Sequence, residues 1–167
     1  FIKYKKSSSP LIETKKINLK REKFSKRHLK EYSMLYLIIN NLNFFLKKVE
    51  TLSEILFSNE QMNNFNKILV DNIVSGTIHN EETFNKAFEK SEFKGLISDI
   101  NNAAPVKIIA QNKNEREINL IFDEIYNELK EINLNIKMSN LENKIAKEMD
   151  ETTYKELINL KNLAKES

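Results

Sequence analysis

The sequence predicts an all-α fold, with a small bundle of five or six short helices followed by a long helix and a C-terminal helical hairpin. The 167 residues include only two Gly and two Pro, whereas sheet proteins need turn residues roughly every ten residues. Apolar residues also recur at intervals of three and four, which places them on one face of a helix. Hydrophobic residues make up 40% of the chain and charged residues 31%, so a packed core is expected.

A long helix is expected from about Asn114 to Lys147, because no Gly or Pro interrupts this stretch. At 1.5 Å per residue it is roughly 50 Å long, which exceeds the diameter of a small domain, so part of it should project beyond the core. An S-x-x-E pattern at Ser139 and Glu142 leaves open a kink at that point. The apolar stripe of this helix consists of Ile118, Phe122, Ile125, Leu129, Ile132 and Ile136.

A second, shorter helix is predicted after Asp150, whose carboxylate suits an N-cap position. Its apolar face is marked by Tyr154, Leu157, Ile158 and Ala164. Because the connection between the two helices is so short, they are expected to lie antiparallel as a helical hairpin. A projecting hairpin suits recognition by another protein.

The bundle is expected to begin with a helix from Arg27 to Asn41. Apolar residues surround nearly its whole circumference, which is typical of a helix in the middle of a bundle. The asparagines at the end of this stretch favour a turn, and two short apolar segments follow at residues 44–49 and 52–57.

Capping signals divide the rest of the bundle. Ser58 with Gln61 forms a capping box that predicts a helix starting at Asn59, and Gly76 suits its C-terminal end. The expected core face of this helix is Met62, Phe65, Ile68 or Leu69, Asn72 and Ile73.

Asn80 is expected to cap the next helix, with Phe84, Ala87 and Phe88 facing inward. Another short helix is expected to carry Phe93, Leu96, Ile97 and Ile100 and to end before Pro105. The segment from Val106 to Ala110 is then either a start to the long helix or an apolar connector. These signals divide the chain into a linker at residues 1–26, a bundle at 27–113, and the long helix with its hairpin at 114–167.

The sequence offers few residues suited to catalysis. The only two histidines, His28 and His79, lie in different predicted elements, so capping or surface roles are favoured over metal binding. The absence of Cys excludes disulfides and thiolate metal sites. No phosphate-binding loop or nucleophile motif is present. We therefore expect no enzymatic activity, cofactor or metal in this chain.

The chain lacks a run of about 18 apolar residues and a signal peptide, so a soluble cytoplasmic protein without membrane contact is expected. It begins with Phe1 and not Met, so we expect it to be a segment of a longer protein. Residues 1–26 are strongly basic, with Glu13 and Glu22 as their acidic residues. Such a stretch is either a solvated tether or an arm that contacts DNA phosphates weakly, and the tether is favoured because no aromatic platform accompanies the charge.

The order of these parts resembles the helicase-binding C-terminal domain of bacterial replicative DNA primase, over roughly Arg27 to Ser167. The family's first helix has the form L-x-x-L-I-N, and Leu35 to Asn40 (L-Y-L-I-I-N) is similar to it. The long charged helix at 115–149, the acidic turn at Asp150-Glu151 and the leucine-bearing helix after it also match the family's order. Relatives often carry His-Pro after the first helix, where this chain has Asn41 and Leu42.

The resemblance implies a docking module that binds the N-terminal collar of the hexameric replicative helicase at the replication fork. It also implies that the zinc-ribbon and polymerase modules lie outside this segment. In the family the C-terminal hairpin provides most of the contact with the helicase. The residues expected to bind the partner here are Tyr154, Leu157, Ile158, Leu160, Lys161 and Leu163. For Tyr154 and Leu157, a role inside the hairpin is an equally good interpretation.

Two alternatives stay open. The helicase collar has a similar fold in this family, so the chain is alternatively the N-terminal collar domain of the helicase, which a linker helix and an ATPase domain would follow. The other alternative is a nucleic-acid-binding helical module led by the basic arm. It predicts salt-sensitive DNA binding that is lost when residues 1–26 are removed, although the net charge of the chain is only +3.

Overall fold

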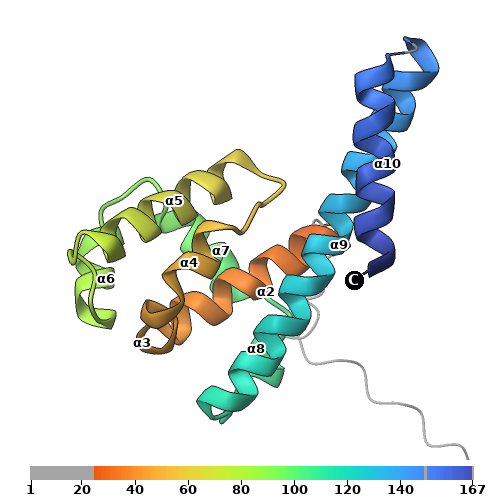
Figure 1. The fold of residues 1–167 in the computed structure, drawn as a ribbon. Helices are drawn as coiled ribbons and strands as arrows, with labels where there is room; N and C mark the ends of the chain where they lie inside the picture. Colours follow the sequence, from red (N-terminus) through yellow and green to blue (C-terminus); the bar gives the residue numbers. More distant parts are fainter. Residues whose placement is uncertain (1–24, 149, 167) are drawn as a thin grey trace, which may run out of the picture. The chain divides into compact units, whose positions relative to one another are not determined.

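The computed structural model describes residues 25–148 and 150–166, and every regular element within them is a helix (Figure 1). The all-α fold class is therefore confirmed for the described residues. The chain forms two compact units with a boundary between Glu115 and Arg116. The first unit holds the helices up to α8, and the second holds α10 and nearly all of α9. Most of the predicted basic linker, residues 1–24, lies outside the described residues.

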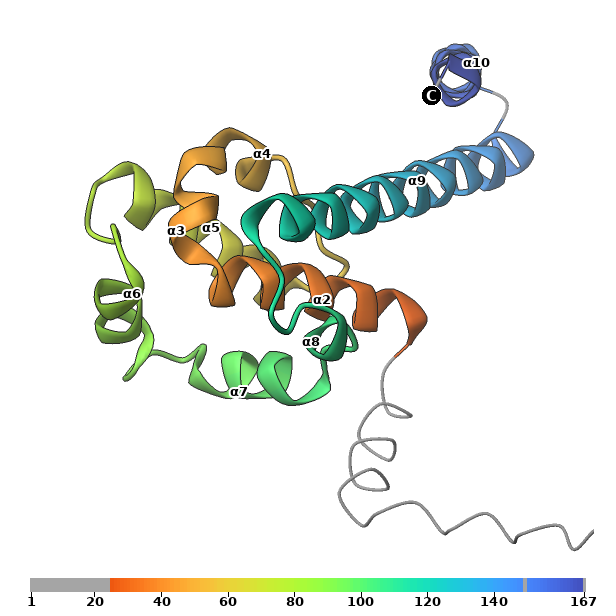
Figure 2. The same cartoon turned by 90° about the horizontal axis from the view of Figure 1, so that it is seen from below.

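Helix α2, Lys26–Asn40, runs through the middle of the first unit (Figure 2). Its N-cap is Ser25, whose Oγ accepts a hydrogen bond from the His28 N–H at 3.2 Å, so the helix starts one residue before the predicted Arg27. It contacts α3 (Leu42–Phe45), α7 (Lys94–Ala103) and α8 (Val106–Ile109). Buried side chains lie around most of the circumference of α2, as its apolar sequence predicts. Its fully buried side chains include Met34, Leu35, Leu37 and Ile38.

The remaining helices of the first unit are short, apart from α5. After α3 come the 3-10 helix η1 (Leu46–Lys48), α4 (Val49–Ser53), α5 (Glu60–Val74) and α6 (Glu81–Phe88). Helices α4 and α5 contact each other. Three rings from α5, α6 and the start of α7 meet in the core, because Phe65 lies 5.1 Å from Phe88 and 5.6 Å from Phe93 between ring centroids.

The prediction that Ser58 caps α5 is wrong, because Ser58 bonds to a buried carboxylate instead. The N-cap is Asn59, whose Oδ1 accepts from the Gln61 N–H at 2.7 Å, and not Ser58. Ser58 donates instead to the fully buried Glu31 of α2, from its N–H and from its Oγ, both at 2.7 Å. Arg27 Nε also donates to Glu31, at 3.1 Å. The Ser58 hydroxyl therefore bonds to a side chain of α2 and does not cap α5.

Two other capping predictions are confirmed. Gly76 follows α5 with a φ of 74°, a left-handed conformation that glycine adopts without steric cost. Asn80 caps α6 in a capping box with Thr83, in which Oδ1 of Asn80 accepts from the Thr83 N–H at 2.9 Å.

The predicted core positions are partly wrong. On α5, Met62 and Phe65 are buried as expected, and Leu69 is the buried one of the two alternatives Ile68 and Leu69. Asn72 and Ile73 are only half-buried, and Asn66, which was not among the expected core residues, is buried. On α6, Phe84 and Phe88 are buried as expected, whereas Ala87 is exposed.

The segment from Val106 forms a separate turn of helix, α8. Asn112, at a φ of 59°, lies in the turn that separates α8 from α9, so α8 is not the start of the long helix.

The second unit is the predicted hairpin. Helix α9, Glu115–Lys147, is continuous through Ser139, so the possible break there does not occur. Helix α10, Glu151–Glu166, runs back along the C-terminal half of α9 (Figure 1). Of the apolar stripe predicted on α9, Ile118, Phe122 and Leu129 are buried, whereas Ile136 is 42% exposed.

Candidate docking surface of the hairpin

Helix α9 carries two apolar stripes on opposite faces. The predicted stripe runs from Ile118 to Ile136. A second stripe, spaced by four, three and four residues, occupies the C-terminal half of the helix, and all its members are half-buried. At about 100° per residue, Leu134 lies roughly 160° around the helix from Ile132. The second stripe consists of Leu134, Met138, Leu141 and Ile145.

Helix α10 has a matching apolar face. Thr153 and Leu157 are 5% and 6% exposed, and Leu160 is half-buried. These positions are four and three residues apart, which is the spacing of a seam between two packed helices. Ala164 continues the face and lines a groove with Leu134 at the open end of the hairpin. Leu157 is therefore part of the hairpin interior.

Polar interactions cap the start of α10 and link the two helices. Asp150 is the N-cap of α10, because its carboxylate accepts hydrogen bonds from the N–H groups of Thr152 (3.3 Å) and Thr153 (3.0 Å). The Thr153 hydroxyl also donates to it at 2.6 Å, and this bond is the main reason that the pKa of Asp150 lies below its ordinary value. Two ion pairs join the helices, Lys137 to Glu156 at 2.8 Å and Lys161 to Glu142 at 2.7 Å.

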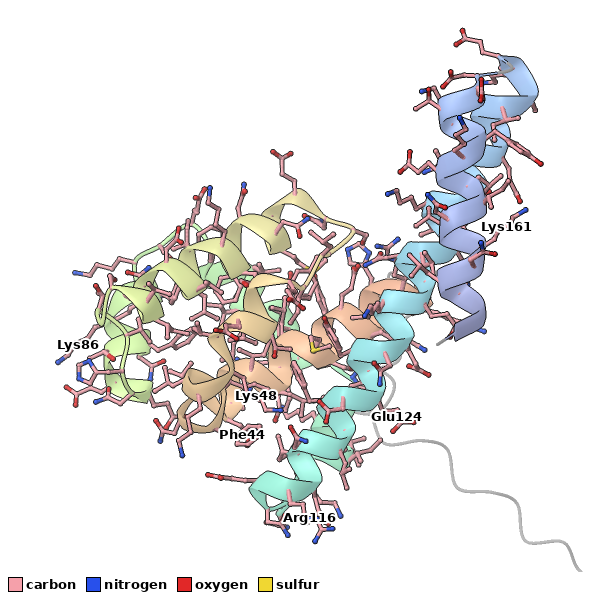
Figure 3. The ribbon with its side chains drawn as sticks, in the orientation of Figure 1. Phe44, Lys48, Lys86, Arg116, Glu124 and Lys161 are labelled. Carbon is pink, nitrogen blue, oxygen red and sulfur yellow. The ribbon has the colours of Figure 1, made fainter. Side chains whose placement is uncertain are left out.

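The structure divides the six residues predicted to bind a partner into different groups. Leu157 is buried and Leu160 is half-buried, as described above. Lys161 is exposed on α10 (Figure 3) and forms its ion pair with Glu142. The other three are exposed apolar side chains, Tyr154 at 54%, Ile158 at 40% and Leu163 at 56%.

Tyr154 and Ile158 are both exposed, and the pair is here called the hairpin patch. They are four residues apart, so their side chains lie on the same face of α10. Leu163 lies about 140° around the helix from Ile158 and does not extend the patch. The Lys155–Glu151 ion pair (2.7 Å) and the Lys161–Glu142 ion pair lie next to the patch in the helical wheel. An apolar centre with a charged, solvent-exposed rim is typical of protein interfaces.

The second stripe of α9 was missed from the sequence. Its spacing is as regular as that of the first stripe. The two stripes overlap in the sequence between Ile132 and Ile136, where the first stripe alone already gives the spacing expected of a helix. The sequence therefore contained the signal for the second stripe, as apolar residues on the opposite side of α9 from the first. Recognising it would have placed Leu157 and Leu160 inside the hairpin.

The described residues contain no cluster of three or more His, Cys, Asp or Glu side chains with the geometry to hold a metal ion. His28 makes an edge-on contact with Tyr32, with 5.9 Å between ring centroids, and the His79 Nδ1 lies 3.4 Å from the Gly76 carbonyl oxygen. Both histidines thus have local contacts within their own segments. Among the same described residues, no helix has the length and apolar character needed to cross a membrane.

Comparison with known proteins gave no significant match to a protein-family model, a curated protein or a solved structure. The resemblance to the primase docking domain therefore stays a prediction.

Proposed function

We propose that this chain is a non-catalytic docking module that binds a partner protein through the hairpin patch. The observation that carries the proposal is the contrast within α10: Leu157 is buried in the hairpin, whereas Tyr154 and Ile158 are exposed beside it. Leu157 and its seam neighbours hold α10 in place, so the patch is presented on a helix that does not need to order on binding. Preorganisation of this kind lowers the entropic cost of association.

The chemistry of the patch supports a protein partner. An aromatic side chain with an apolar neighbour is the composition of many interface hot spots, and tyrosine is enriched in them. The two ion pairs near the patch are solvent-exposed, and exposed pairs contribute little free energy, so most of the binding energy should come from burying Tyr154 and Ile158. A groove on the partner that accepts a helix face fits this surface.

The partner that we propose is the N-terminal collar of a hexameric replicative helicase, with primase as the protein to which the module belongs. This part of the proposal rests on the sequence resemblance. In this arrangement the module brings primer synthesis to the replication fork, and residues 1–26 serve mainly as a tether. If the chain belongs to a primase, as the resemblance implies, it acts in the cytoplasm, at the replication forks of the nucleoid.

A pull-down with the immobilised collar domain of the helicase from the same genome tests the proposal. The chain should be retained at micromolar concentrations, and a Tyr154→Ala/Ile158→Ala double variant should be lost from the beads. Retention of the double variant at the wild-type level would place the contact elsewhere. Failure of the wild-type chain to bind would exclude the helicase as the partner.

A further inference from the structure

A pocket of about 200 Å³ lies in the first unit, at the corner where α2 ends and α3 begins, and is here called the corner pocket. The first residues of α6 and α9 complete its wall, and the first residue of α9 still belongs to the first unit. None of the described residues that line it is basic. The lining includes Asn40, Asn41, Asn43, Phe44, Glu81 and Glu115.

Asparagine side chains at this corner offer hydrogen-bond acceptors. The Asn40 Nδ2 donates to the Tyr36 carbonyl oxygen at 2.9 Å and to Asn101 Oδ1 at 3.1 Å. The Asn41 Nδ2 donates to the Leu37 carbonyl oxygen at 3.0 Å. No described residue donates to the Oδ1 atom of Asn40 or Asn41. These two oxygens are therefore groups that a ligand with N–H donors can bind.

The electrostatics of the corner pocket favour a cation. Helix α2 has 15 residues and no basic residue in its last turn, so no side chain there offsets the negative end of its dipole. The carboxylates of Glu81 and Glu115 are exposed and form no hydrogen bond or ion pair with any described residue. Each is the first residue of its helix, where a negative charge is favoured. The pocket thus combines two carboxylates with a helix carboxyl end and lacks a cation of its own.

The ring of Phe44 forms an aromatic wall that already attracts a cation. The Nζ of Lys48 lies 5.2 Å from the centroid of this ring, within the range of a cation–π interaction (Figure 3). Lys48 is not part of the pocket lining and forms no ion pair with Glu81 or Glu115. The charge of Lys48 therefore does not replace a cation inside the pocket.

From this arrangement we infer that the corner pocket binds the guanidinium group of an arginine on a partner protein. A guanidinium carries five N–H donors and no acceptor, which matches a lining of amide and carboxylate oxygens. It is also planar and stacks on aromatic rings, whereas the ammonium of lysine supplies only the charge. Its positive charge complements the carboxylates of Glu81 and Glu115. The site lies in the first unit and is independent of the hairpin patch and of its partner.

The test is an NMR titration of the isotope-labelled full chain with the capped peptide acetyl-Gly-Arg-Gly-amide at millimolar concentrations. Binding should shift the side-chain amide signals of Asn41 and Asn43 and the backbone signal of Phe44. A peptide with citrulline in place of arginine has nearly the same shape without the charge and should bind at least about fivefold more weakly. A lysine peptide should also bind more weakly than the arginine peptide. Absence of the shifts, or equal binding of the citrulline or the lysine peptide, would overturn the proposal.

Two variants at equivalent helix positions locate the site. Glu81→Gln neutralises a carboxylate of the corner pocket and should weaken binding of the arginine peptide about threefold. Glu60→Gln is the matched control, since Glu60 is the exposed first residue of α5 and does not line the pocket. Both variants change the net charge equally, so a non-specific effect of charge would appear in both. Equal weakening in the two, or unchanged binding in a folded Glu81→Gln chain, would contradict the placement.

Discussion

Tyr154 and Leu157 lie three residues apart on α10, yet Leu157 is 6% exposed and Tyr154 is 54% exposed. The exposed fractions differ because Leu157 lies in the seam between α10 and α9, whereas Tyr154 lies on a face of α10 that is directed toward solvent. One short helix therefore separates two roles: one face holds the hairpin together and the neighbouring face is available to a partner.

The seam role predicts unequal effects of the same substitution at two leucines. Leu157→Ala should lower the free energy of unfolding of the hairpin by about 2–4 kcal/mol, because it leaves a cavity at a buried position. Leu163→Ala is the control and should change it by less than about 0.5 kcal/mol, since Leu163 is 56% exposed. Amide hydrogen exchange along α10 measures both. Similar protection factors in the two variants would show that Leu157 is not in the seam.

The buried Glu31 should anchor the segment before α5 to α2. Ser58→Ala removes the Oγ donor 2.7 Å from a fully buried carboxylate oxygen and should destabilise the first unit by about 1.5–3 kcal/mol. Ser53→Ala is the control, because the Ser53 hydroxyl donates at 2.6 Å to the Glu50 carbonyl oxygen at an exposed site. Chemical denaturation should separate the two variants, and equal midpoints would contradict the anchoring role.

The Asp150 cap predicts acid sensitivity at the start of α10. Hydrogen bonds from Thr153 and Thr152 lower the pKa of Asp150 in the folded chain. A lowered pKa means that the cap stabilises the hairpin above the ordinary aspartate pKa and that this contribution is lost as the pH falls through the folded value. Exchange protection of the Thr152 and Thr153 amides should follow this pH dependence.

Asp150→Asn is the matched variant for that experiment, because asparagine also caps helices but does not titrate. Its amide protection should no longer respond to acid through this group. A wild-type acid response that persisted unchanged in Asp150→Asn would assign the effect to another carboxylate.

The ion pair between Lys161 and Glu142 should make only a small contribution to the hairpin. Both side chains are about half exposed, and exposed pairs typically contribute about 0.2–1 kcal/mol. A double-mutant cycle with Lys161→Ala and Glu142→Ala should give a coupling energy in this range that vanishes near 1 M salt, where the Debye length is about 3 Å. A coupling energy well above about 1 kcal/mol would require a role beyond surface pairing.

The sequence predicts helix ends well where the signal is local. Gly76 and Asn80 were placed correctly because their signals are local: a left-handed residue after a helix and a capping side chain before one. Ser58 was misplaced because the competing partner, Glu31, lies 27 residues away in the chain and is brought near only by tertiary structure. Local pattern alone cannot reveal that competition.

The hairpin site shows the same limit. The face of α10 that becomes buried depends on which face of α9 it meets, and α9 has apolar residues on two. The stripe from Ile118 to Ile136 was identified, whereas the stripe from Leu134 to Ile145, which pairs with α10, was not. Six candidate contacts were therefore named together, although Leu157 is interior and Tyr154 is exposed.

Binding through the hairpin patch is tested most directly by a calorimetric titration of the full chain into the helicase collar domain, alongside the Tyr154→Ala/Ile158→Ala variant and the Leu163→Ala control. We expect the wild-type chain to bind and the Leu163→Ala control to bind equally well. The double variant should bind at least about tenfold more weakly while keeping its helical circular dichroism. Wild-type affinity in the double variant, or no binding by the wild-type chain, would contradict binding through the hairpin patch.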